Sequence, residues 1–296
     1  MNFNKKLLAL TISLFTTFTL TACNDDDNKT TQPSLPTPEV TPPLLPEVTE
    51  NTPNSIALTH LTSYKTGIFG QSAAEIPAYD ANSQRAFVVN AQAGALDVLD
   101  LSNPNQPVKI AQITVEDIAL GAQVNSVAVQ NGIIAIAIQA AKKTDLGYVG
   151  FYTASDLTKI SHIQVGALPD MLTFTPDGKT VLVANEGEPS DDYQIDPEGS
   201  ISIINISNLK QPTIKTADFK NFNAQATQLR TQGVRIFGPN ATAAQDFEPE
   251  YITVSSDGKT AWAALQENNA LAKIDIQQAK VTAIYPLGFK DHGLTG

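Results

Sequence analysis

The sequence is poor in the residues on which several large protein classes depend. It holds a single cysteine, Cys23, and three histidines among 296 residues. One cysteine cannot form a disulfide within a chain. The sequence also contains no His-Glu-x-x-His motif, no Gly-x-Ser-x-Gly elbow and no phosphate-cradling glycine loop. The sequence therefore lacks the recognisable signatures of zinc proteases, α/β-hydrolases and nucleotide-binding proteins.

Positive charge is also scarce. Lys and Arg number 19 against 30 Asp and Glu, which gives a formal net charge of −11. This balance argues against nucleic acid and against an anionic membrane surface as partners. No stretch shows a sustained helical period of apolar residues, so an α/β fold is disfavoured.

The N-terminus has the pattern of an export signal. Lys5 and Lys6 precede an apolar run over residues 7–20 that is too short to span a bilayer. The following letters "LTAC" resemble the lipobox of bacterial lipoproteins, which implies cleavage after residue 22 and acylation of Cys23. The alternative is an ordinary signal peptide with an incidental cysteine. Asn24, directly after the cysteine, favours the outer membrane over the inner one.

Residues 23–55 are rich in Pro, Thr and acidic residues and hold few large apolar ones. Such a segment cannot bury enough surface to fold, and it prefers extended conformations. We expect a linker that holds the body, residues 56–296, away from the membrane. The predicted partners are therefore the lipid bilayer, through Cys23, and an unknown small ligand or protein.

Four segments of the body repeat one pattern of short strands. They are Ile76–Ile113, Val124–Val165, a third segment that begins at Leu168, and Glu248–Leu287. Each reads as four strands joined by tight turns, and a period of about 40–50 residues with four strands is typical of β-propeller blades. The prediction is an all-β propeller with four visible blades. A β-sandwich is the alternative, but it does not explain the repeat.

Turn signals support the repeat. Asp-Gly pairs lie in "PDGK" at 176–179 and "SDGK" at 256–259, and Asn-Gly lies in "QNG" at 130–132. An insertion over about 220–247 explains the longer spacing before the fourth segment. Most propellers have more than four blades, and the chain ends just after a fourth strand. We therefore expect an incomplete propeller.

Acidic residues concentrate in loops without a Lys or Arg among them. In the predicted topology, the loop between the second and third strands lies on the same face as the crossing to the next blade. The candidate metal ligands on that face are Glu186, Glu188, Asp196, Glu198, Glu248 and Glu250. Ca²⁺ takes about six to eight oxygen ligands, so it is the expected cofactor if the face binds a metal. A solvated acidic rim is the alternative, and Asp191 and Asp192 suit it best.

Long motifs resemble a known family. "LPDMLTFTPDGKTVLVANEGEPSDDYQIDPEGSISIINIS" and "GVRIFGPNATAAQDFEPEYITVSSDGKTAWAALQENNALAKIDI" are similar to choice-of-anchor I proteins, as is the final "YPLGFKDH". The resemblance covers residues 56–296 and implies a bacterial surface or secreted propeller. Its members continue past the equivalent of His292 with further blades. Many carry an alkaline phosphatase label, which implies a possible phosphoesterase activity.

The sequence leaves two function classes open. A binding or display module needs no catalytic group, and none is recognisable. A calcium-dependent phosphoesterase is the alternative, with His292 and Asp291 as weak catalytic candidates and Arg235 as a phosphate clamp. The simpler interpretation of Arg235 is a surface salt bridge. His60 and His162 are isolated in strand-like contexts, which suggests structural roles.

Overall fold

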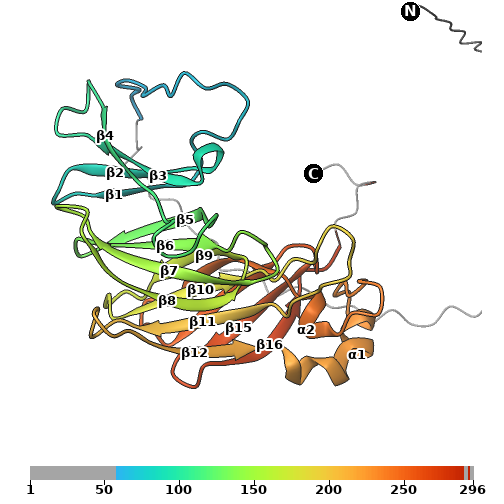
Figure 1. Cartoon of the computed structure of the whole chain (residues 1–296). Coiled ribbons are helices and arrows are strands. Elements are labelled where there is room, and N and C mark those ends of the chain that lie inside the picture. Colours follow the sequence, from blue (N-terminus) through green and yellow to red (C-terminus); the bar gives the residue numbers. More distant parts are fainter. Residues whose placement is uncertain (1–57, 290–292, 294–296) are drawn as a thin grey trace, which may run out of the picture. The chain divides into compact units, whose positions relative to one another are not determined.

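The computed structural model describes residues 58–289 and residue 293 (Figure 1). The predicted signal peptide, Cys23 and the linker up to residue 55 lie outside the described residues, as do Asp291 and His292. Among the residues described, no helix is long and apolar enough to cross a membrane.

The body consists of four antiparallel sheets of four strands each. The first contains β1 (Pro77–Asp80), β2 (Arg85–Asn90), β3 (Ala95–Asp100) and β4 (Val108–Ile113). The second contains β5 (Gln123–Gln130), β6 (Ile133–Gln139), β7 (Leu146–Thr153) and β8 (Lys159–Ala167). The third contains β9 (Pro169–Phe174), β10 (Thr180–Asn185), β11 (Ser200–Asn205) and β12 (Thr213–Asp218). The fourth contains β13 (Pro249–Val254), β14 (Thr260–Leu265), β15 (Ala270–Asp275) and β16 (Lys280–Pro286).

The sheets are arranged as propeller blades. Strand order follows the chain within every sheet, and the first strands of successive sheets, β1, β5, β9 and β13, lie next to one another. Figure 1 shows the sheets following one another from the blue end of the body to the red end. The all-β propeller prediction is confirmed, with the four predicted repeats as its blades.

The core lies between facing blades. Ile134 and Ile136 of β6 pack against the first blade, while Ala135 and Ala137 of the same strand pack against the third. All four side chains are fully buried, because an inner blade is covered on both faces. This explains why β6 reads as a continuous apolar run rather than an alternating one.

The turns differ in detail from their predicted form. Asn131 and Gly132 both have positive φ, as the Asn-Gly signal requires. In the two Asp-Gly turns, only Gly178 and Gly258 have positive φ. The preceding aspartate instead accepts hydrogen bonds: Asp177 Oδ1 lies 3.1 Å from the backbone nitrogen of residue 179 and 2.7 Å from the hydroxyl of residue 175. These aspartates therefore stabilise the turn through their side chains.

A helical segment joins the third and fourth blades. It contains η2 (Lys220–Gln225), α1 (Ala226–Thr231) and α2 (Ala243–Asp246), and one further helical turn, η1 (Ala91–Ala93), lies in the first blade. The α2 helix begins with a capping box between Thr242 and Gln245. Phe219 and Phe247 flank the segment and pack edge to face, with ring centroids 5.4 Å apart. The segment is thereby anchored to the core between these two blades.

Candidate functional site

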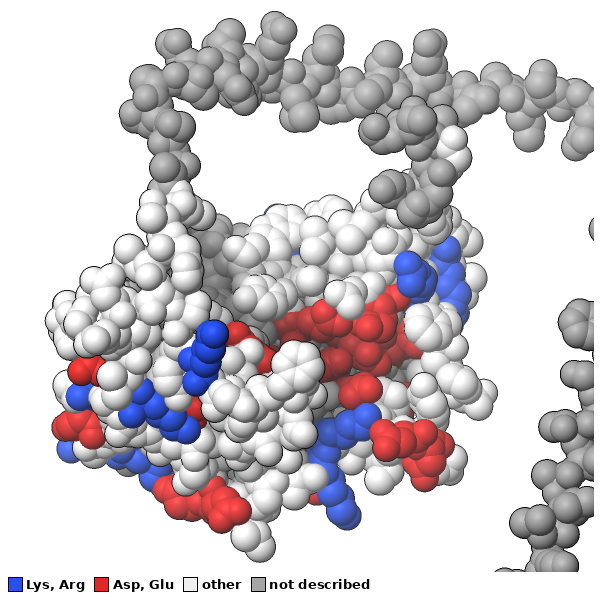
Figure 2. Space-filling model, turned by 90° about the horizontal axis from the view of Figure 1, so that it is seen from above, with Lys and Arg blue, Asp and Glu red and all other residues white. Residues whose placement is uncertain are grey.

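Eight carboxyl groups gather at one end of the body and form what we call the acidic hollow. They belong to Asp170, Glu186, Glu188, Asp196, Asp246, Glu248, Glu250 and Glu267. Figure 2 shows acidic side chains concentrated in a depression of this face. The hollow is built from the third and fourth blades and the helical segment between them.

Blade topology explains why these residues meet. Asp170 is the second residue of β9, and Glu250 is the second residue of β13. Glu186 directly follows β10, and Glu267 lies in the equivalent loop after β14. In an antiparallel blade, the start of the first strand and the end of the second lie at the same edge. Neighbouring blades therefore bring these positions together at one end.

Several carboxyl groups of the hollow resist ionisation. Burial raises the pKa of Glu186 to about 8, and repulsion by neighbouring carboxylates contributes. Burial also raises the pKa of Glu248 to about 7, with a further contribution from Glu267. The pKa of Glu250 is raised to about 7 by burial and by contact with the carboxyl group of Glu267. Burial raises the pKa of Asp170 as well. Several of these acids therefore hold protons near neutral pH.

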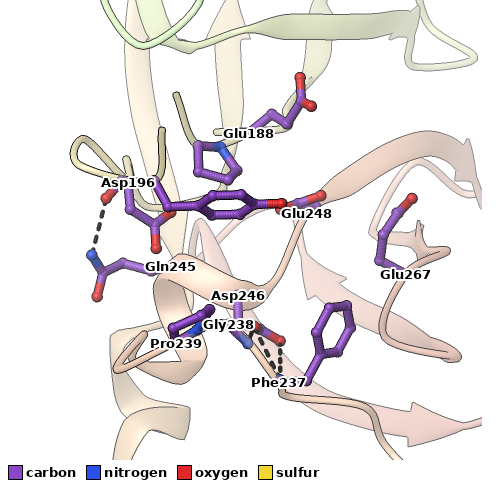
Figure 3. Close-up of a pocket in the computed structure, with 11 residues that line it drawn as sticks. Glu188, Asp196, Phe237, Gly238, Pro239, Gln245, Asp246, Glu248 and Glu267 are labelled. Atoms are coloured by element: carbon purple, nitrogen blue, oxygen red, sulfur yellow. Dashed lines mark hydrogen bonds between the residues drawn. The ribbon is translucent and has the colours of Figure 1, made fainter. Parts of the chain in front are cut away.

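A cavity of about 230 Å³ opens within the hollow (Figure 3). Its acidic lining residues are Glu188, Asp196, Asp246, Glu248 and Glu267, and no Lys or Arg that the structure describes lines it. Its apolar walls are Pro189, Tyr193, Phe237 and Pro239. Tyr193 and Phe237 are 66% and 68% exposed, so both rings are accessible to a ligand.

Asp246 differs from the other acids because its carboxylate already accepts several hydrogen bonds from the protein. The backbone N–H groups of Phe237 and Gly238 donate to its carboxylate (Figure 3). The side-chain amide of Asn268 donates to it as well. Asn268 also donates to the backbone carbonyl of Arg235. These bonds fix the cavity wall, and Asp246 is therefore a structural residue of the site.

Glu188 is the one acid of the cavity with a cationic partner among the described residues. Lys143, in the loop after β6, lies 3.0 Å from its carboxylate and 3.2 Å from that of Asp191. Asp191 is almost fully exposed, and Asp192 accepts hydrogen bonds from Ser190 and Gln194 within its own loop. Both residues thus lie in the solvated part of the loop.

The structure separates one predicted ligand from the other five. Glu186, Glu188, Asp196, Glu248 and Glu250 all belong to the hollow, whereas Glu198 pairs with Lys220 at 3.0 Å. This lysine belongs to the helical segment, so sequence position alone gave no sign of the pairing. Glu267 and Asp246 were missed. The place of Glu267 after the second strand of its blade, like that of Glu186, is a signal that could have identified it.

Among residues 58–289, no three Asp, Glu, His or Cys side chains come close enough to form a ready metal site. The acids of the hollow face a common space without converging on one point. In Figure 3, Asp196 and Glu267 lie on opposite sides of the cavity. The arrangement supplies negative charge over an extended surface rather than at a chelating centre.

The remaining described candidates do not line the cavity. The side chain of Arg235 is exposed and forms no ion pair with a described residue. His162 on β8 packs edge to face against Tyr148, with centroids 6.1 Å apart. His60 is exposed outside any strand and contacts Ser63, so its predicted strand-like context is wrong.

Solved structures of low sequence identity are similar to this chain. A protein from Lactobacillus plantarum superposes with a TM-score of 0.50 at 14% identity, over 72% of this chain and 57% of that one. A functionally unknown protein from Desulfotomaculum acetoxidans gives 0.49 at 10% identity, over 72% and 56%. The Dos1 propeller gives 0.49 at 12% identity, over 72% and 47%. The chain thus spans about half the length of these proteins.

Sequence comparison identifies the family. No curated protein matches the chain. The model of the choice-of-anchor I domain matches residues 75–296, which include all four blades and every acid of the hollow. The chain therefore belongs to the choice-of-anchor I family.

Proposed function

We propose that this protein is a lipid-anchored β-propeller of the bacterial envelope whose acidic hollow binds a positively charged ligand. Membership of the choice-of-anchor I family indicates a bacterial surface or cell-envelope protein. The lipobox-like "LTAC" supports attachment through an acylated Cys23, and Asn24 favours the outer membrane. Multiple acyl chains bury enough methylene groups for stable anchoring.

The observation that carries the ligand proposal is the unrelieved repulsion in the hollow. Glu186, Glu248 and Glu250 have pKa values of about 7 to 8, because each is partly buried beside other acids. Carboxylates with a purely structural role normally accept hydrogen bonds from neighbouring groups. The side chains of Glu186 and Glu248 accept none from any described group. A cation that enters the hollow stabilises the ionised forms. The attraction between the cation and the ionised carboxylates therefore provides the free energy of binding.

Calcium is the simplest candidate cation, because carboxylate oxygens are its preferred ligands. Glu186, Glu248 and Glu250 would hold it, and it would neutralise their charges. Since no ready three-ligand site exists among the described residues, calcium has to draw these side chains closer.

A thermal melt of the full chain tests the binding proposal. After chelation, Ca²⁺ and the dication of 1,4-diaminobutane are added separately. A ligand at about a hundred times its dissociation constant adds about 2.7 kcal/mol of stability, which is several degrees in the midpoint. We expect at least one of the two to raise the midpoint, and the variant Glu248→Gln with Glu250→Gln to lose that rise. Unchanged midpoints with both cations would contradict the proposal.

Calcium-dependent phosphoester hydrolysis is the second candidate function. The observation in its favour is the guanidinium of Arg235, which has no acidic partner among the described residues and whose backbone N–H donates to the carbonyl of Asn268, next to Glu267. An arginine beside a calcium-binding acidic face suits a phosphate group. The test is release of nitrophenol from p-nitrophenyl phosphate with and without Ca²⁺. A rate that Glu186→Gln combined with Glu250→Gln leaves unchanged would rule this function out.

A further inference from the structure

We infer that the cavity of the acidic hollow binds an alkyl diammonium compound, a linear molecule with two ammonium groups joined by methylenes. This inference rests on the proposed function and names the chemical class of its ligand. Such a ligand fits three features of the cavity: acids that lack a partner among the described residues, the separation of these acids, and the apolar walls between them.

Several acids that line the cavity lack a hydrogen-bond donor among the described residues. The Oε2 atom of Glu267 is buried and has no hydrogen-bond partner among the described residues. The carboxylates of Asp196 and Glu248 also receive no hydrogen bond from any described group, although both line the cavity. A buried acceptor without a donor is costly. Each ammonium group carries three donors, so two such groups can donate hydrogen bonds to acids that the described residues leave unsatisfied.

The acids of the cavity are separated from one another. A single metal ion needs its ligands at one point, and no three described acids meet in that way. In Figure 3, Asp196 and Glu267 lie on opposite sides of the cavity, with Glu248 between them. Two separated positive charges match this distribution better than one compact charge.

The cavity also has apolar walls. Tyr193, Phe237, Pro189 and Pro239 line the same cavity as the acids. The faces of aromatic rings attract ammonium groups, and rings together with proline give methylenes an apolar surface. A hydrated metal ion makes no use of such walls. The volume of about 230 Å³ lies below the usual range for drug-sized ligands, which suits a short linear molecule.

Replacing Phe237 tests the contribution of the aromatic wall without changing the charge of the hollow. Its side chain is 68% exposed, and the bond to Asp246 comes from its backbone. Phe237→Ala therefore leaves the fold and the charge of the hollow intact. Phe69→Ala is the matched control, because Phe69 is 98% exposed and does not line the cavity.

The experiment is calorimetric titration of the full chain at low salt with 1,4-diaminobutane, 1-aminobutane and Ca²⁺. We expect the diamine to bind at least about tenfold more tightly than the monoamine, because it pairs with acids on both sides. Phe237→Ala should weaken the diamine about two- to fivefold and leave Ca²⁺ unchanged, while Phe69→Ala changes neither. Glu267→Gln should weaken the diamine more than the monoamine.

Three results would count against the inference, and each has a different meaning. If Ca²⁺ binds and the diamine binds no more tightly than the monoamine, the diammonium ligand is wrong and the proposed cation-binding function stands. If neither Ca²⁺ nor any amine binds, both the inference and the proposed function fail. Diamine binding that Phe237→Ala does not weaken would also contradict the aromatic wall as part of the site.

Discussion

The side-chain amide of Asn268 lies 2.6 Å from the backbone carbonyl of Asp246 and 3.1 Å from its carboxylate. Asn268 is fully buried, and its carbonyl oxygen accepts the backbone N–H of Glu248. One side chain thus joins the helical segment, the start of the fourth blade and the loop after β14. These three elements form part of the wall of the cavity.

Asn268→Ala should destabilise the fold markedly. Removing the amide leaves buried acceptors and a backbone donor unpaired, which costs about 1–3 kcal/mol for each buried group left unsatisfied. We expect a loss of at least about 2 kcal/mol in the free energy of unfolding, measured by urea denaturation. The control is Asn221→Ala, because Asn221 is exposed and its side chain forms no hydrogen bond with a described residue. Equal effects of the two changes would contradict the joining role of Asn268.

Stability should fall as the pH rises toward 8. The pKa of Glu186 is raised from 4.5 to about 8, so between these values the folded state holds more protons than the unfolded state. Stability then decreases with increasing pH over this window. Glu186→Gln should remove part of this slope and raise the melting midpoint at pH 8.

Glu198→Gln is the control for that measurement, because Glu198 lies outside the hollow and pairs with Lys220. It should leave the slope between pH 5 and 8 (about the window set by Glu186) unchanged. A melting midpoint that stays level over this range in the unmodified protein would show that Glu186 ionises normally.

Lys143 should compete with ligand for Glu188. Its ammonium lies 3.0 Å from the Glu188 carboxylate at the edge of the hollow. Lys143→Met removes this partner and makes the hollow more negative, so cation affinity should rise about two- to fivefold, the scale of a partly exposed ion pair. Lys179→Met, in the turn after β9, changes the net charge equally without touching Glu188. Calorimetric titration of both variants separates the local effect from the effect of total charge.

Cys23→Ser should release the protein from the membrane. The residue is the only thiol that could carry the acyl chains. Membrane and soluble fractions of expressing cells, probed with an antibody, give the measurement. A variant that remains in the membrane fraction would contradict anchoring through Cys23.

The blades were predictable from the sequence because each carries its own local signals. Asn131 and Gly132 mark a two-residue turn, and the apolar run of β6 marks a strand covered on both faces. These signals depend on neighbours in the chain and on one repeated topology. The same topology predicted that Glu186 and Glu250 lie together.

The finer arrangement of the site was not predictable, because it depends on contacts between distant segments. Glu198 is paired by Lys220, which belongs to the helical segment, and Asp246 is held by Asn268 from the fourth blade. Neither pairing leaves a pattern in the sequence. The irregular helical segment has no repeat from which its position could be inferred.

Proton release on ligand binding tests the central claim most directly. At pH 7, Glu186 is mostly protonated and Glu248 and Glu250 are partly so, since their pKa values are about 8 and about 7. A cation in the hollow lowers these pKa values. Titration of the full chain with 1,4-diaminobutane or Ca²⁺, in two buffers of different ionisation enthalpy, counts the protons released. We predict about one proton or more per bound cation at pH 7 and far fewer at pH 9. Binding without proton release at pH 7 would place the cation elsewhere and contradict the account.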